Sequence, residues 1–96
     1  MAGIGPFIWD EVKYEANLAS HRVDFAEAMR FDWDNAQFTV DSRHDYGEAR
    51  VVAVSRIGAR VHVLVFTQRA DRIRIISLRK ANDREIRRYE KSQSQT

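Results

Sequence analysis

Three consecutive segments alternate apolar and polar residues and are separated by very short connections. They are "RVVAVSRI" (residues 50–57), "RVHVLVFTQ" (residues 60–68) and "RIRIISLR" (residues 72–79). Gly58 and Ala59 join the first two segments, and "RAD" joins the second to the third. Alternation with a period of two predicts half-buried strands, and such short connections require neighbouring strands to run antiparallel. The three segments therefore predict an antiparallel meander.

The last of these strands changes its apolar side partway along. Ile73 and Ile75 fall on one face, whereas Ile76 and Leu78 fall on the other. Strict alternation places Arg79 on the face of Ile73 and Ile75. A β-bulge, or burial of both faces near the strand end, explains the change.

Helix-capping signals flank this sheet on both sides. Asp10 is a suitable N-cap for a helix over residues 11–20. Asp24 and Glu27 form a capping box that predicts a second helix over residues 25–31. A second capping box, formed by Asn82 and Glu85, predicts a helix that ends near Lys91.

Two further short strands complete the predicted elements. "GPFIWD" reads as a strand or extended entry that Pro6 limits to a strand start or an edge, and "QFTV" alternates around Phe38 and Val40. The expected fold class is α+β, with two N-terminal helices, an antiparallel sheet of about four strands and a C-terminal helix. We expect one domain over residues 1–96, with a core at about residues 7–91 and a frayed tail at residues 92–96.

The composition excludes several classes of protein. The chain has 96 residues, of which 44% are hydrophobic and 31% charged, as in globular proteins rather than disordered ones. It has no cysteine, so disulfide frameworks and thiolate metal sites are excluded. Neither a signal peptide nor an apolar run of transmembrane length is recognisable. A cytoplasmic protein without a cofactor or metal is expected.

Charge is distributed unevenly along the chain. Residues 1–49 carry four Lys or Arg against ten Asp or Glu, and residues 50–96 carry twelve against four. Thirteen of the sixteen cations are arginine, whose planar fork suits phosphate. Either the basic half binds a phosphate-rich partner, or it forms a solvated sheet face that is balanced by the acidic half.

Three blocks of the sequence resemble the BrnT toxin family. They are "FIWDEVKYEANLASHRVDFAEA" (Phe7–Ala28), "DSRHDYGEARVVAVSRIGARVHVLVFTQR" (Asp41–Arg69) and "RIRIISLRKANDREIRRYE" (Arg72–Glu90). The resemblance implies a toxin of a type II toxin–antitoxin pair, with a RelE-like α+β fold, that cuts RNA without a metal. It also implies a small ribbon-helix-helix antitoxin that covers the toxin, and a complex of the two that binds operator DNA.

RNA cleavage without a metal needs a base for the 2′-OH proton, cations for the phosphorane and an acid for the leaving 5′-oxygen. Together with the resemblance, this requirement predicts the catalytic residues Lys13, His21, Glu48, Arg50, Arg79 and Tyr89. Contacts to RNA are expected from His44, Arg72, Arg74 and Lys80, and contacts to the antitoxin from Arg84, Arg87 and Arg88.

Each of these assignments has a structural alternative. Glu48 and Arg50 are expected on one strand face, where Glu48 is a base or orients Arg50, and the alternative is an edge ion pair between the two. Arg79 is either a phosphate ligand or half of a buried pair with Asp or Glu. For His21 the alternative is a helix-end contact or a packed imidazole, and for Tyr89 it is packing of the last helix on the sheet. A domain that binds RNA, or that acts as an antitoxin-bound corepressor without catalysis, is the alternative function.

Overall fold

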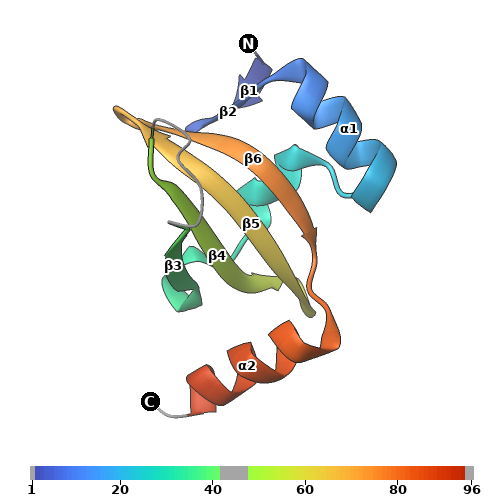
Figure 1. Cartoon of the computed structure of the whole chain (residues 1–96), viewed down its shortest axis with the longest axis vertical. Helices are drawn as coiled ribbons and strands as arrows, with labels where there is room; N and C mark the ends of the chain where they lie inside the picture. The colour runs from blue at the N-terminus through green and yellow to red at the C-terminus, as the bar shows by residue number, and fades with distance from the viewer. Residues whose placement is uncertain (1, 42–47, 95–96) are drawn as a thin grey trace.

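The computed structural model describes residues 2–41 and 48–94 and is built on a six-stranded mixed sheet (Figure 1). The strand order is β1-β2-β6-β5-β4-β3. The strands are β1 (Ala2–Ile4), β2 (Phe7–Trp9), β3 (Gln37–Asp41), β4 (Arg50–Ile57), β5 (Arg60–Arg69) and β6 (Arg72–Lys80). The helices are α1 (Glu11–His21), the 3₁₀ helices η1 (Phe25–Arg30) and η2 (Trp33–Asn35), and α2 (Asp83–Ser94).

The predicted meander forms the centre of the sheet. Strands β4, β5 and β6 pair antiparallel, with Ile57 opposite Arg60 across the first turn and Arg69 opposite Arg72 across the second. Gly58 supplies the positive φ that the first turn needs, at +62°. Ala70 adopts φ +54° in the second turn, a conformation that is costly for a residue with a Cβ.

A β-bulge on β6 accounts for the change of its apolar side. Val65 pairs with Ser77 and Phe66 pairs with Ile75, so Ile76 is the extra residue on β6. Beyond the bulge the alternation is reversed, and Arg79 lies on the face opposite to Ile75. Of the two explanations that the sequence offered, the bulge is therefore confirmed, and the placement of Arg79 beside Ile75 by strict alternation was wrong.

The expected sheet of about four antiparallel strands was wrong in number and in direction. Gly5 and Pro6 separate β1 from β2, which pair as an antiparallel hairpin, and Gly5 has φ +58°. Strand β2 then runs parallel to β6, with Phe7 opposite Ile73. The segment "AGI" has no alternating pattern of its own, so only its pairing with β2 reveals it as a strand.

The second predicted N-terminal helix was also wrong, because η1 is a 3₁₀ helix rather than an α-helix. Phe25, Ala28 and Phe31 are all buried, and their spacing of three residues matches the 3.0 residues per turn of a 3₁₀ helix. Asp24 does act as the N-cap, since its side chain accepts a hydrogen bond from Ala26 N. Capping chemistry thus predicted where the segment begins but not which helix follows.

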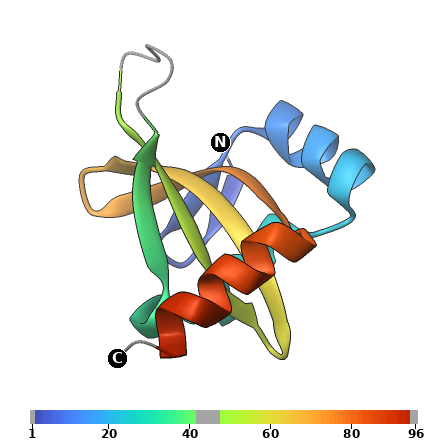
Figure 2. The ribbon, with the colours of Figure 1, turned by 60° about the horizontal axis from the view of Figure 1, so that its bottom comes forward.

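The two faces of the sheet carry different cores. On one, which we call the η1 face, η1 and the aromatic residues of β2 pack on Leu64, Phe66, Ile75 and Leu78. On the other, the α2 face, Tyr89 and Ile86 pack on Val61 and Val63. Helix α2 crosses this face near one end of the central strands (Figure 2). The α2 face therefore carries side chains of β4, β5 and β6 beyond the reach of that small core.

Helix α1 docks along the edge of β6 through a buried asparagine. Asn17 donates to the carbonyl oxygens of Leu78 at 2.8 Å and Val23 at 3.0 Å, and its own oxygen accepts from Leu78 N at 3.1 Å. Strand β2 pairs with β6 only at Ile73 and Arg74. The Asn17 amide therefore takes the place of a neighbouring strand where β2 has ended.

The C-terminal helix begins at the predicted capping box. Asn82 and Glu85 exchange side-chain-to-backbone hydrogen bonds, both of 2.9 Å. The helix continues to Ser94, beyond the predicted end near Lys91 and into the tail that was expected to be frayed. No helix in residues 2–41 and 48–94 is both long and apolar enough to span a membrane.

Candidate functional site

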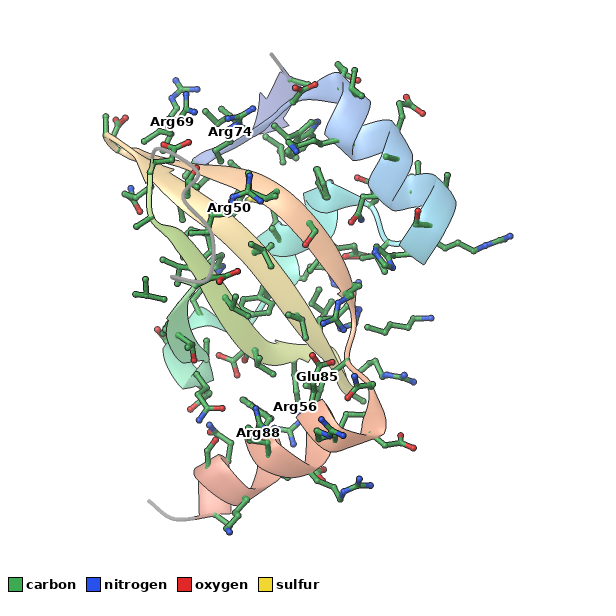
Figure 3. The ribbon with its side chains drawn as sticks, in the orientation of Figure 1. Arg50, Arg56, Arg69, Arg74, Glu85 and Arg88 are labelled. Atoms are coloured by element: carbon green, nitrogen blue, oxygen red, sulfur yellow. The ribbon has the colours of Figure 1, made fainter. Side chains whose placement is uncertain are left out.

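Arginines gather on the α2 face at the end of the sheet away from α2 (Figure 3). Thr67 pairs in register with Arg74, and Val51, which follows Arg50, pairs with Phe66, which precedes Thr67. Arg50, Thr67 and Arg74 are therefore side by side across β4, β5 and β6. We call these three residues the arginine row. The bulge at Ile76 places Arg74 and Arg79 on one face despite their odd spacing.

Arg74 is a largely buried cation that forms no hydrogen bond with the described residues. Its side chain is 18% exposed, and its guanidinium nitrogens lie 3.9 Å from Asp10 Oδ2 and 4.0 Å from Glu48 Oε1. These distances allow electrostatic attraction but exceed those of hydrogen bonds. Its Nε has no partner among the residues described. A buried guanidinium in this condition is expected to have a ligand.

The centre of the row holds a second polar group, the hydroxyl of Thr67. Thr67 is 1% exposed, and its hydroxyl has no hydrogen-bond partner within the described parts of the chain. Arg50 is half-buried at the start of β4 and pairs in register with Asp41, the last residue of β3. The row thus presents a hydroxyl between two guanidinium groups.

A carboxylate lies at the margin of the row. Both oxygens of Glu48 accept hydrogen bonds from Arg69, at 2.8 and 3.2 Å. This pairing with Arg69, aided by the charges of Arg74 and Arg50, holds the pKa of Glu48 below its ordinary value. Glu48 is consequently ionised at neutral pH, and it is a weaker base than an ordinary glutamate.

A groove continues from the row toward α2, and we call it the α2 groove. It has a volume of about 380 Å³. The side chains of Val52 and Val54 line it together with polar groups of β3 and α2, namely Gln37, Thr39, Asp41, Glu85 and Arg88. Because Arg50 and Val52 are two residues apart on β4, the groove begins one side-chain position from the row.

An ion pair closes the α2 end of this face. Arg79 donates to both carboxylate oxygens of Glu85, at 2.8 and 2.9 Å, and so connects β6 to α2. That hydrogen bonding lowers the pKa of Glu85 and raises the pKa of Arg79. Of the two alternatives for Arg79, the structure shows the pair with a carboxylate.

Tyr89 is packed beneath the last helix. It is fully buried, and its hydroxyl donates to the carbonyl oxygen of Asn35 at 3.0 Å. The guanidinium of Arg56 lies 5.2 Å from the centre of its ring. These contacts stabilise the packing of α2 on the sheet, and they occupy the hydroxyl that was expected to serve catalysis.

The remaining predicted residues lie apart from the arginine row. Lys13 and His21 line a separate groove of about 240 Å³ between α1 and Ile76. Arg72 is exposed as the first residue of β6, and Lys80 is exposed as the last residue of that strand. Arg84, Arg87 and Arg88 are exposed on α2, and of these Arg88 lines the α2 groove. His44 lies outside the described residues.

The sequence analysis missed Thr67 and Arg69. Both follow Val63 and Val65 at a spacing of two on β5, so alternation places them on the α2 face. The tight turn at Ala70 and Asp71 then sets the register that brings Thr67 opposite Arg74. Arg69 was assigned to the turn, whereas it is the last residue of β5.

This arrangement suits the binding of a phosphodiester. Guanidinium groups bind phosphate oxygens through paired hydrogen bonds, and partial burial strengthens their attraction for an anion. Cations that are already positioned before the reaction can stabilise the extra negative charge of a pentavalent phosphorus intermediate. Within the described ranges, no three His, Cys, Asp or Glu side chains are grouped as a metal site.

Comparison with known proteins agrees with this chemistry. Residues 9–85 match the family model described as the ribonuclease toxin, BrnT, of type II toxin-antitoxin systems. Among curated proteins, none matches the chain. The match includes the whole arginine row, Glu48 and the ion pair of Arg79 with Glu85. The chain therefore belongs to the BrnT family of type II toxin–antitoxin ribonuclease toxins.

Proposed function

We propose that this toxin is an endoribonuclease that cleaves RNA without a metal, and that the arginine row binds the scissile phosphate. The observation that supports the proposal most directly is Arg74. It is 18% exposed and has no hydrogen bond within the described residues, so a phosphate would satisfy a charge that the fold otherwise leaves poorly paired. The Thr67 hydroxyl beside it is a further donor for a phosphate oxygen.

The proposed reaction is an internal transesterification. The 2′-oxygen attacks phosphorus after loss of its proton, the bond to the 5′-oxygen breaks, and that oxygen takes up a proton. The products are a 2′,3′-cyclic phosphate and a free 5′-hydroxyl. Arg50 and Arg74 stabilise the added negative charge on phosphorus, which is the largest contribution in many enzymes of this kind.

Glu48 is proposed as a positioning residue rather than as the base. Its two oxygens are held by Arg69, and its lowered pKa makes it a poor proton acceptor. It orients Arg69 and attracts Arg74, which lies 4.0 Å away. Glu48→Gln should therefore lower the cleavage rate without removing a limb of the pH–rate profile. Loss of the acidic limb would instead identify Glu48 as the base.

The proposed antitoxin is a ribbon-helix-helix protein that presents an acidic segment to the exposed arginines of α2. Arg84 and Arg87 are exposed on that helix, and no described residue forms an ion pair with them. Operator DNA would then be bound only through the antitoxin complex. Charge reversal at both positions should weaken the complex, whereas the cleavage of free RNA should remain.

The decisive experiment compares Arg74→Gln with a matched control in EDTA. Arg60→Gln is the control, because Arg60 is an exposed arginine of the same sheet outside the row. Wild type and Arg60→Gln should cleave total RNA, and Arg74→Gln should be slower by a factor of about 100 or more. Circular dichroism and thermal unfolding establish that both variants are folded.

Two results would contradict the proposal. Cleavage that stops in EDTA and returns with added metal would show that the reaction depends on a metal. Salt-sensitive RNA binding without cleavage, on free RNA and on translating ribosomes, would favour the non-catalytic alternative.

A further inference from the structure

The α2 groove has a different chemical character from the arginine row that it adjoins. Its floor is apolar, formed by Val52 and Val54 of β4. Its walls carry the polar groups of Gln37, Thr39 and Asp41 on β3 and of Glu85 and Arg88 on α2. A flat apolar floor bordered by hydrogen-bonding groups suits an aromatic ring with polar edges.

The polar groups on the walls differ in whether they are already used. Both oxygens of Glu85 are occupied by Arg79, and one also accepts from Asn82 N. By contrast, the side chains of Gln37, Thr39 and Arg88 form no hydrogen bond within residues 2–41 and 48–94. Arg88 lies one helical turn beyond Glu85 on α2 and is attracted to its carboxylate by charge alone. Three hydrogen-bonding side chains are therefore available around the apolar floor.

The groove and the row form one continuous surface. Arg50 belongs to the row, and Val52 and Val54 follow it on the same face of β4, each about 7 Å further along. In single-stranded RNA a base is attached to the ribose next to each phosphate. When the scissile phosphate lies on the row, a base next to it has the α2 groove within reach.

We infer that the α2 groove binds one nucleobase next to the scissile phosphate and that it selects guanine. This inference rests on the proposed function, because it takes the arginine row as the phosphate site. The planar guanidinium of Arg88 can donate two parallel hydrogen bonds, and guanine offers the matching pair of acceptors, O6 and N7. Gln37 and Thr39 can donate or accept at the remaining edge, and Val52 and Val54 contact the face of the ring.

This assignment separates Arg88 from its neighbours on the helix. Arg88 lines the groove, whereas Arg84 and Arg87 do not. Arg88 would read a base, and the other two remain available to the antitoxin. Arg84→Ala is therefore a matched control for Arg88→Ala, since each removes one exposed arginine from the same helix.

The first test maps the cleavage sites of the full-length protein on a long unstructured RNA. Guanine should be enriched at one position beside the cut. Short RNAs that differ only at that position then give kcat/KM for each of the four bases. The wild type and Arg84→Ala should prefer guanine over adenine by about tenfold, as expected for one double hydrogen bond to a base. Arg88→Ala should reduce this preference to nearly one.

Gln37→Ala provides a second variant that does not alter charge. It should reduce the preference for guanine while leaving the salt dependence of RNA binding unchanged, because no phosphate contact is lost. If the loss of Arg88 loosens α2 so that Arg88→Ala does not fold, Gln37→Ala on β3 keeps the inference testable.

A parallel experiment measures binding of oligonucleotides with a 2′-deoxy sugar at the cut position, which cannot react. Base-selective binding without cleavage of ordinary RNA would support the groove assignment and overturn the catalytic proposal. Cleavage without base preference, or with a preference that both variants retain, would overturn the groove assignment and leave the catalytic proposal intact. If both variants keep the preference but lose the antitoxin, the groove binds protein and the inference is wrong.

Discussion

Replacing Asn17 with alanine should destabilise the fold more than most single substitutions in this chain. Asn17 is 6% exposed and forms three hydrogen bonds to backbone groups of Leu78 and Val23. Alanine removes all three. The N–H and C=O of Leu78 then lose their partners beside a side chain that is fully buried.

The size of the effect follows from these orphaned groups. A buried polar group that loses its partner costs about 1–3 kcal/mol, and two of the three groups belong to one buried residue. Partial entry of water into the space left by the amide recovers some of this, so we expect a loss of about 3 kcal/mol. Since the free energy of unfolding of natural domains is about 5–15 kcal/mol, that loss is a large share of the total stability.

Urea unfolding followed by circular dichroism measures the loss. With a slope of about 1–3 kcal/mol per molar urea, the midpoint should fall by about 1–3 M. Ser20→Ala is the control, because Ser20 is exposed on the same helix and should change stability by less than about 0.5 kcal/mol. A loss below about 1 kcal/mol for Asn17→Ala would refute the view that this amide replaces a strand at the edge of β6.

Three further predictions concern other parts of the molecule. Glu85→Gln should make the unfolding free energy less dependent on pH, because hydrogen bonding to Arg79 lowers the pKa of Glu85 in the folded protein. In the wild type, the pair of Glu85 with Arg79 contributes its full stability above the ordinary pKa of 4.5. This contribution is lost as the pH falls through the lower pKa of the folded state. If the unfolding free energies of the two proteins decrease equally as the pH is lowered, this reasoning is wrong. Arg22→Gly should raise the unfolding free energy by about 1 kcal/mol, because Arg22 ends α1 with φ +58°, and a lower melting temperature would oppose that reasoning. Thr67→Val should raise the unfolding free energy by about 1 kcal/mol, because it removes a buried hydroxyl that no described residue pairs with. The same substitution should slow RNA cleavage. An unchanged cleavage rate would show that Thr67 is not part of the proposed site.

The parts of the fold that local patterns control could be predicted from the sequence. Alternation and short turns located β4, β5 and β6 to within one residue at their ends, and Asn82 with Glu85 located the start of α2. The parts that depend on distant pairing could not. Strand β1 has no pattern of its own, and the parallel pairing of β2 with β6 depends on a partner at the other end of the chain.

The candidate site shows the same division. Arg74 and Glu48 could be chosen from the sequence because their residue types suit phosphate chemistry. Thr67 could not, because its significance comes from burial between two arginines that the register brings together. Likewise, strict alternation put Arg79 on the opposite face of β6, since a one-residue bulge reverses every side chain that follows it.

The position of β2 inside the sheet has a consequence for how the chain folds as it is synthesised. Strand β2, made early in synthesis, has its place between β1 and β6, and β6 is the last of these strands to be made. Until Ile73 and Leu78 have emerged, Phe7 and Trp9 have no sheet to pack against, and Asn17 has no backbone to hold. Contacts between such distant segments form slowly and late. The nascent toxin therefore has no complete core, and no assembled arginine row, until β6 has left the ribosome.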